Sequence, residues 1–167
     1  MPPYPDIVSQ EGHKGYILMC RAACPDSLVV RTAWLYGAHG PCFPRTMARL
    51  AGERDSLSVV EDQVGQPTWT VDLAALVVRL LVAQAPAGTY HGTSAGWTSW
   101  FGFAREVVAA AGHDADMVEP TTSQAFPRPA TRPEWSVLSH DSLRAVGVAP
   151  IGPWRDRWHA AAPEVLA

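Results

Sequence analysis

The stretch LVVRTAWLYG, residues 28–37, gives the clearest indication of the fold. It begins with an apolar run that has no polar alternation, which predicts a buried strand over residues 28–34. Strands of this kind are typical of parallel sheets, which are covered on both faces. Because ligands bind at the carboxyl ends of strands in open α/β sheets, we expect part of a binding site near Trp34.

The composition is that of an ordinary folded domain. The chain has 167 residues, of which 47% are hydrophobic and 17% are charged, so it can bury the core of one domain. The net charge is −3 and there is no basic run, which argues against nucleic acid or an acidic membrane as a main partner. The first residues do not resemble a signal peptide, and we expect a cytoplasmic protein.

The cysteines and histidines do not predict a metal site. Cys20, Cys24 and Cys42 form no framework of pairs, and we expect small buried thiols in a reducing compartment. Cys20 and Cys24 lie one helical turn apart, but no second pair or suitably spaced histidine completes a zinc site. We therefore predict no catalytic metal.

Strand and helix patterns alternate along the rest of the chain, which predicts an α/β fold. Residues 1–12 contain three prolines and no periodicity, and we expect an extended arm there, followed by a single domain over residues 13–167. The expected strands cover residues 28–34, 56–60, 88–92 and 117–119. The expected helices cover residues 13–23, 44–53, 70 to about 86, 99–111 and 140–146, with a last helix from residue 153.

Two of these helices have the clearest sequence signals. The first should start at Thr70 and bury one continuous apolar stripe. The second should be capped by Thr98 or Ser99 and closed by Gly112. The predicted stripe of the first helix consists of Leu73, Leu76, Val77, Leu80 and Leu81.

Four stretches then follow one another in an order typical of one enzyme family. They are LVVRTAWLYG, RTMARLAGERDSLSVVEDQVGQPTWTVDLA, GTYHGTSAGWTSWFGFAREVVAAAG and RPATRPEWSVLSHDSLRAVGV. Together they resemble the C-terminal half of dTDP-4-dehydrorhamnose reductase and related nucleotide-sugar 4-ketoreductases of the extended short-chain dehydrogenase/reductase superfamily. The resemblance covers roughly residues 20–160. It implies the C-terminal part of a Rossmann-like fold with a small substrate-binding lobe.

The resemblance implies roles for the residues that end the first strand. Arg31, Thr32 and Ala33 would line the nicotinamide end of NADPH or NADH, mostly through their backbone. Trp34 would face the deoxysugar, because an indole offers an apolar face and an N–H donor. The alternative for Trp34 is an ordinary core tryptophan at a strand end.

The segment VVEDQVGQPTWT is implied to bind the nucleotide sugar through Gln63 and Thr68. A glycine and a proline would shape a tight loop around these two residues. The neighbouring acids Glu61 and Asp62 could suggest general acid and base chemistry. Adjacent side chains at a strand end point apart, however, and this favours solvated turn acids.

The segment RPATRPEWSVL is implied to bind the diphosphate. Arg132, together with Arg128, would provide guanidinium groups, which bind phosphate in a bidentate manner. Arg132 begins the pattern R-P-x-x-S-x-L that is typical of the family. The alternative is a surface arginine without a ligand.

The sequence lacks the Tyr-x-x-x-Lys pattern that carries catalysis in this superfamily. Lys14 lies close to the expected lysine, but Gln10 stands four residues before it. No G-x-x-G-x-x-G fingerprint follows a first strand and opens a helix. We therefore expect that the upstream strands are missing, that the catalytic site is incomplete, and that binding of NADPH or NADH by this chain alone is doubtful.

The missing strands also predict a partner. Without them the strand at 28–34 would expose an edge, which favours pairing with another copy or with a separately encoded N-terminal half.

The favoured hypothesis is a dTDP-4-dehydrorhamnose reductase-like protein, truncated or half of a split enzyme, that binds a dTDP-4-keto-6-deoxysugar. The alternative is a non-catalytic nucleotide-sugar-binding or regulatory subunit derived from the same family. A decayed gene product with no selected role stays open as well.

Overall fold

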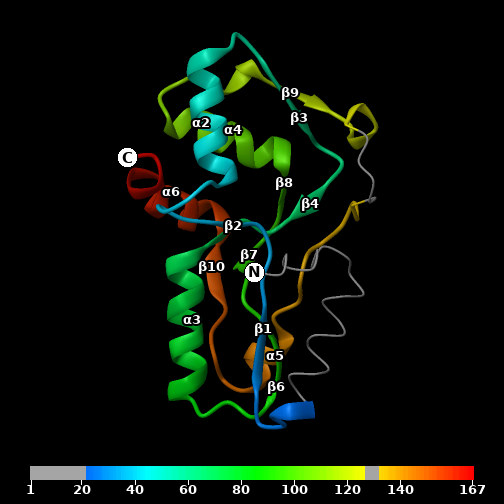
Figure 1. Ribbon diagram of the computed structural model, residues 1–167, viewed down its shortest axis with the longest axis vertical. Coiled ribbons are helices and arrows are strands. Elements are labelled where there is room, and N and C mark those ends of the chain that lie inside the picture. The colour runs from blue at the N-terminus through cyan, green and yellow to red at the C-terminus, as the bar shows by residue number, and fades with distance from the viewer. Residues whose placement is uncertain (1–21, 127–131) are drawn as a thin grey trace, which may run out of the picture.

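The computed structural model describes residues 22–126 and 132–167 of the chain (Figure 1). Several predicted features lie outside these residues and are not tested by the structure: the arm over residues 1–12, most of the helix over residues 13–23, Cys20, Lys14 and Arg128. In the described part, no helix is long and apolar enough to cross a membrane.

The first strand is shorter than the sequence predicts. Strand β1 spans Leu28–Arg31 and pairs in parallel with β6, Gly88–His91. The chain then leaves the extended conformation, since Trp34 has a left-handed backbone with φ of 49°. Strand β2, Leu35–Tyr36, begins directly afterwards. The prediction of one strand over residues 28–34 was therefore wrong at its carboxyl end.

Helix α3, Thr70–Val82, packs beside the β1–β6 pair at the lower end of the molecule (Figure 1). The predicted stripe is only partly correct, because Leu81 is 61% exposed. Thr70 is the first helical residue and not the cap, which is Trp69. The core here joins α3, β6 and the short helix α5, Asp141–Ala145; its buried members are Leu76, Leu80, Tyr90, Leu143, Val148 and Ile151.

The opposite end of the molecule is a lobe of two helices and a second parallel strand pair. Strand β3, Leu57–Val60, pairs with β9, Val118–Thr121, and both predicted strands are confirmed. Helices α2, Phe43–Glu53, and α4, Trp100–Ala110, pack on this pair (Figure 1). Single helical turns at Ala115–Met117 and Ser123–Ala125 flank β9.

The start and end of α4 are as the sequence predicts. The Ser99 hydroxyl accepts a hydrogen bond from the backbone N–H of Gly102, which satisfies a free donor in the first turn. Gly112 follows the helix with φ of 84°, a conformation that favours glycine.

An aromatic core joins this lobe to the last helix, α6, Trp154–Val165. The Phe103 ring lies 5.5 Å from Trp158 and 5.6 Å from Tyr36, measured between ring centroids. Trp158 is fully buried, and its indole N–H donates to the backbone carbonyl of Glu106. Edge-on aromatic contacts of this kind stabilise a core beyond the area that they bury.

Six strands of two or three residues lie between the lobe and the lower sheet (Figure 1). They pair as β2 with β5, β4 with β8, and β10 with β7. The periodicity of the sequence did not predict them, because two residues are too few to show an alternation. Their bounds are Val64–Gly65 for β4, Thr68–Trp69 for β5, Ser94–Ala95 for β7, Thr98–Ser99 for β8 and Ile151–Pro153 for β10.

Candidate functional site

Trp34 is held rigidly at the point where the chain leaves β1. Its indole stacks on Trp100 with ring centroids 3.6 Å apart and planes within 9°. It also lies directly over Gly65, where a Cβ atom would collide with the indole. The side chain stays partly exposed. An indole that is held by these contacts and is still partly exposed can contact a sugar ring without losing freedom on binding.

The three residues before Trp34, of which Arg31 is the last residue of β1, differ in exposure. Arg31 is exposed, and its carbonyl accepts from the Gly92 N–H at 2.7 Å. Ala33 is half-buried. The Thr32 hydroxyl is buried and has no hydrogen-bond partner within the described residues. A buried hydroxyl without a hydrogen-bond partner destabilises the fold. A hydrogen bond from a ligand or from a missing segment would therefore stabilise Thr32 more than the other two residues.

Gln66 is a residue that the sequence did not single out, and it connects three segments of the chain. Its Nε2 donates to the carbonyls of Ser94, at 3.1 Å, and Leu138, at 3.4 Å. Its Oε1 accepts from the Leu138 N–H, at 2.8 Å, and from the Thr93 hydroxyl, at 3.0 Å. All four hydrogen-bonding positions of this buried amide are thus used.

The same network fixes the protonation of His140. The single hydroxyl hydrogen of Thr93 is given to Gln66, so Nε2 of His140, 2.9 Å from the Thr93 oxygen, must donate to it. Burial of the ring is the main cause that lowers the pKa of His140, and the charge of Arg144 lowers it further. The hydrogen bond to Thr93 thus places a proton on Nε2, and the lowered pKa favours the neutral ring.

The two residues predicted to bind the nucleotide sugar lie in different surroundings. Thr68 is fully buried; its hydroxyl donates to the Gln66 carbonyl at 3.0 Å and accepts from the Ser94 N–H at 3.3 Å. These bonds give Thr68 a structural role and argue against the predicted ligand contact. Gln63 is half-buried beside α4, and its carbonyl accepts from the Trp100 N–H.

The segment that begins at Arg132 is bonded along β4. The Val64 N–H donates to the Glu134 carbonyl at 2.7 Å, and the N–H and hydroxyl of Ser136 both donate to the Val64 carbonyl. Arg132 itself is exposed. Trp34 covers Gly65, and residues 134–136 bond to Val64. The Trp34 indole and the segment that follows Arg132 therefore meet at consecutive residues of β4.

Glu61 and Asp62 do not form an acid and base pair. The Asp62 carboxylate accepts from both the backbone N–H and the hydroxyl of Ser123, each at 2.8 Å. These bonds, the backbone one first, lower the pKa of Asp62 and keep it ionised. Glu61 is exposed. The interpretation of both as turn acids agrees with this geometry.

The described residues contain no group of three or more potential metal ligands among His, Cys, Asp and Glu. The prediction of buried thiols was wrong for Cys24, which is exposed, whereas Cys42 is half-buried and its thiol donates to the Gly37 carbonyl. Proline and aspartate after Cys24 turn the chain at the surface before β1, which explains its exposure.

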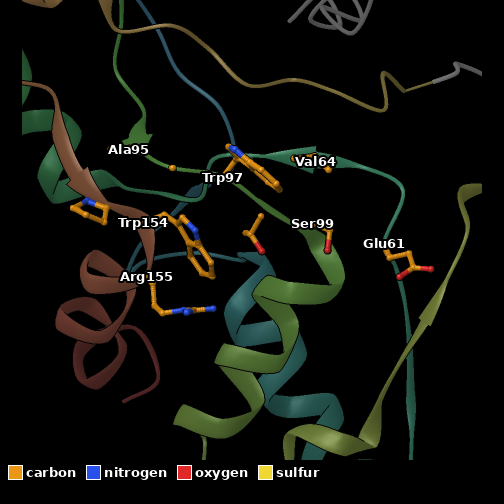
Figure 2. A pocket seen from close by; sticks show the side chains of 10 residues that line it. Glu61, Val64, Ala95, Trp97, Ser99, Trp154 and Arg155 are labelled. Atoms are coloured by element: carbon orange, nitrogen blue, oxygen red, sulfur yellow. The ribbon is translucent and has the colours of Figure 1, made fainter.

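A cavity of about 640 Å³ lies beside this region and was not predicted (Figure 2). Trp97, Trp154, Arg155 and Ser99 surround it, with Glu61 at one end. No sequence signal of the kind used above could have found it, because its walls come from the β7–β8 loop, β4 and the start of α6, which are distant in sequence.

Comparison with known proteins assigns these features to one family. The model of the RmlD substrate binding domain family matches residues 18–166. A dTDP-4-dehydrorhamnose reductase of Streptomyces griseus is 49% identical over 78% of this chain and 45% of its own length. A dTDP-4-keto-6-deoxy-D-glucose reductase of Streptomyces niveus is 46% identical over 77% of this chain and 44% of its own.

Solved structures agree in fold. A dTDP-4-dehydrorhamnose reductase from Clostridium acetobutylicum superimposes with a TM-score of 0.88 at 37% identity, covering 94% of this chain and 55% of that one. The enzyme of the same name from Bacillus anthracis, solved with NADP, gives 0.84 at 32% identity, covering 92% and 54%. The α/β class and the Rossmann-like neighbours predicted from sequence are thereby confirmed, and the chain spans about half the length of the curated relatives that it matches.

Proposed function

This chain belongs to the RmlD substrate binding domain family, and we propose that it binds a dTDP-4-keto-6-deoxysugar as the sugar-binding half of a nucleotide-sugar 4-ketoreductase. The observation that carries the proposal is the convergence on β4: the fixed Trp34 indole covers Gly65, and the Arg132 segment pairs with Val64. The names of the relatives supply the substrate class. Cytoplasmic location, as the sequence predicts, suits a reaction on nucleotide sugars.

Trp34 would hold the deoxysugar. Its stacking on Trp100 and its contact with Gly65 fix the ring before the ligand arrives, so little side-chain entropy is lost on binding. Arg132 would bind the diphosphate, since an exposed guanidinium can contact two phosphate oxygens at once. Arg128, which lies outside the described residues, and Gln63 are secondary candidates for the same ligand.

The reaction would use NADPH or NADH, which supplies the hydride for the ketone at C4 of the sugar. The residues of this chain fit only the nicotinamide end: Arg31 ends β1, Thr32 and Ala33 follow it, and the buried Thr32 hydroxyl has no partner in the described part. No glycine fingerprint for the pyrophosphate stands in this sequence. We therefore assign most of the cofactor contacts, and the proton donor, to the half of the relatives that this chain does not cover.

The lower sheet provides the surface for that missing half. The apolar residues of β1 are only half-buried, although they lie in the strand that the sequence marks as a core strand. Helix α3 also exposes Val78, Leu81 and Val82 beside it. Apolar surface of this extent is typical of an interface. We propose that further parallel strands cover it, from the same polypeptide or from a separately encoded N-terminal half, with a second copy of this chain as the alternative.

A second candidate is a non-catalytic nucleotide-sugar-binding or regulatory subunit. It is favoured by one observation, that the residue four positions before Lys14 is Gln10 and not tyrosine. An amide cannot take the place of a phenol as proton donor.

Reconstitution tests the proposed function. The chain is mixed with the N-terminal half of the Streptomyces griseus relative, and NADPH oxidation is followed with dTDP-4-dehydrorhamnose. We expect oxidation only when both halves are present. Arg132→Ala should raise KM at least about tenfold, equivalent to 1.4 kcal/mol. Arg49→Ala is the matched control, because Arg49 lies on the exposed surface of α2 and, within the described residues, pairs only with its helical neighbour Glu53.

The outcomes separate the candidates. The non-catalytic subunit would be favoured if the chain bound dTDP-rhamnose saturably, if Arg132→Ala abolished this binding, and if the two mixed halves oxidised no NADPH. A lack of dTDP-sugar binding in the unmodified chain would contradict both.

A further inference from the structure

The cavity of Figure 2 is lined by Val64 of β4 and by Ser99 of β8, and Trp34 is not one of its lining residues. Val64 and Gly65 are consecutive residues of a strand, so their side-chain directions are opposite. Val64 lines the cavity, whereas Trp34 occupies the space where a Cβ of Gly65 would be. None of Trp34, Gln63 and Arg132, the residues proposed above to bind the nucleotide sugar, lines this cavity.

Two indoles form its apolar walls. Trp154 is almost fully buried and is held by edge-on contact with Phe103, so its position is fixed. Trp97 is 57% exposed and lies across the cavity (Figure 2). Gly96 brings the Trp97 loop close to Trp154, since it has φ of 75° and a Cβ there would lie 3.3 Å from the Trp154 ring.

The exposed tryptophans continue beyond the cavity. The ring centroid of Trp135, itself 56% exposed, lies 5.3 Å from that of Trp97, with the planes inclined at 60°. Two large indoles exposed side by side are unusual on a free surface and indicate a binding region.

The polar groups around the cavity are balanced in charge. The Arg155 guanidinium pairs with Glu106 at 3.0 Å and lies over the Trp154 ring, so its charge is already compensated. The exposed Glu61 carboxylate at the other end disfavours an anion. The Ser99 hydroxyl accepts from Gly102 and keeps its own hydrogen free to donate.

From these groups we propose that the cavity binds a neutral pyranose ring, as a free monosaccharide or as the end of a glycan. Its volume lies within the range typical of small-molecule sites. The C–H face of a pyranose fits against an indole, and its hydroxyls can donate to Glu61 and accept from Ser99. A nucleotide fits less well, because its phosphates would meet the Glu61 carboxylate. The site is independent of the proposed reductase function.

Saturation-transfer NMR of the chain with methyl glucoside, methyl rhamnoside and thymidine tests this site. We expect a methyl glycoside to bind, and dTDP not to displace it. Trp97→Ala should weaken that binding about tenfold. Glu61→Gln, a conservative change on an exposed side chain, should weaken it less while the thermal unfolding curve stays the same. Val82→Ala, at an exposed apolar residue at the end of α3 and outside the cavity, is the control and should leave glycoside binding unchanged.

Three results would overturn the proposal. Thymidine could bind in preference to both glycosides, which would assign the cavity to a base. Glycoside binding could be equal in Trp97→Ala and the unmodified chain. Finally, Trp34→Ala or added dTDP could abolish it, which would place the glycoside in the nucleotide-sugar site.

Discussion

The upper lobe and the lower β1–β6 sheet differ in how far they bury the apolar residues of their first strands. In the lobe, Leu57 and Val59 of β3 are buried, and Phe103 and Val107 of α4 are at most 1% exposed. In the sheet, the apolar residues of β1 are half-buried, and Val82 at the end of α3 is 78% exposed. The lobe thus completes its core with residues of this chain. Strand β1 of the sheet is as apolar as a core strand, but the described residues do not cover it completely. The position of the sugar site therefore depends on the lobe and on the contacts that join it to the sheet.

The largest expected effect comes from the core of the lobe. Phe103→Ala should lower the free energy of unfolding by about 3–5 kcal/mol, because the ring is buried among Tyr36, Trp154 and Trp158 and leaves a cavity. Val82→Ala in the sheet region should change it by less than about 0.5 kcal/mol. Urea unfolding followed by circular dichroism measures both. Equal effects would contradict the difference between the two regions.

Gln66 comes next, since it connects the loop after β4 with both the Thr93 segment and Leu138. Gln66→Leu leaves the Leu138 N–H and the Ser94 carbonyl without their partner, which should cost about 3 kcal/mol. Gln63→Leu, at the half-buried position directly before β4, should cost less than about 1 kcal/mol. Urea unfolding compares the two, and a Gln66→Leu variant as stable as Gln63→Leu would show that the network does not join the segments.

A smaller effect is expected at the ion pair between α6 and α3. Arg157 donates two hydrogen bonds to Asp72, at 2.7 and 2.9 Å, in a partly buried position over Trp69. Arg157→Met should lower stability by about 1.5–2 kcal/mol. The same change at Arg49, whose pair with Glu53 is exposed, should cost less than about 0.5 kcal/mol. Thermal unfolding at low and high salt tests this, since only the exposed pair should be screened strongly.

The smallest effect is a pH dependence that arises at His140. Its pKa is lowered in the folded chain, so the unfolded chain binds a proton more readily as the pH falls below the ordinary histidine value near 6.5. The contribution of neutral His140 to the free energy of unfolding is therefore complete above about pH 6.5, and it is lost as the pH falls toward the lower pKa of the folded state. His140→Gln should flatten the stability profile below pH 6.5 relative to His159→Gln at the exposed His159. Identical slopes in the two variants would contradict the account.

Long elements with a regular pattern could be predicted from the sequence. Helix α4 shows this best, since Ser99, the apolar face with Phe103 and Val107, and Gly112 all indicate the same bounds. The end of β1 could not be predicted, because the left-handed backbone of Trp34 depends on Trp100 and Gly65, which are distant in sequence. Periodicity contains no information about such a contact.

The candidate site was predicted only in part for the same reason. Trp34 and Arg132 were assigned to the ligand because their motifs resemble those of the family. The structure places the Trp34 indole and the segment after Arg132 beside the same strand, β4. Thr68 was assigned to the ligand because its hydroxyl can form hydrogen bonds, but tertiary packing buries that hydroxyl against Ser94. Gln66 and Thr93 were missed, because the sequence of a polar loop does not show which of its amides and hydroxyls are buried.

The central claim is that this chain holds the sugar nucleotide without holding the dinucleotide. Calorimetric titration of the chain with dTDP-rhamnose and, separately, with NADPH tests it most directly. We predict saturable heat with dTDP-rhamnose, lost in Arg132→Ala, and none with NADPH. Stoichiometric binding of NADPH by the chain on its own would contradict the account.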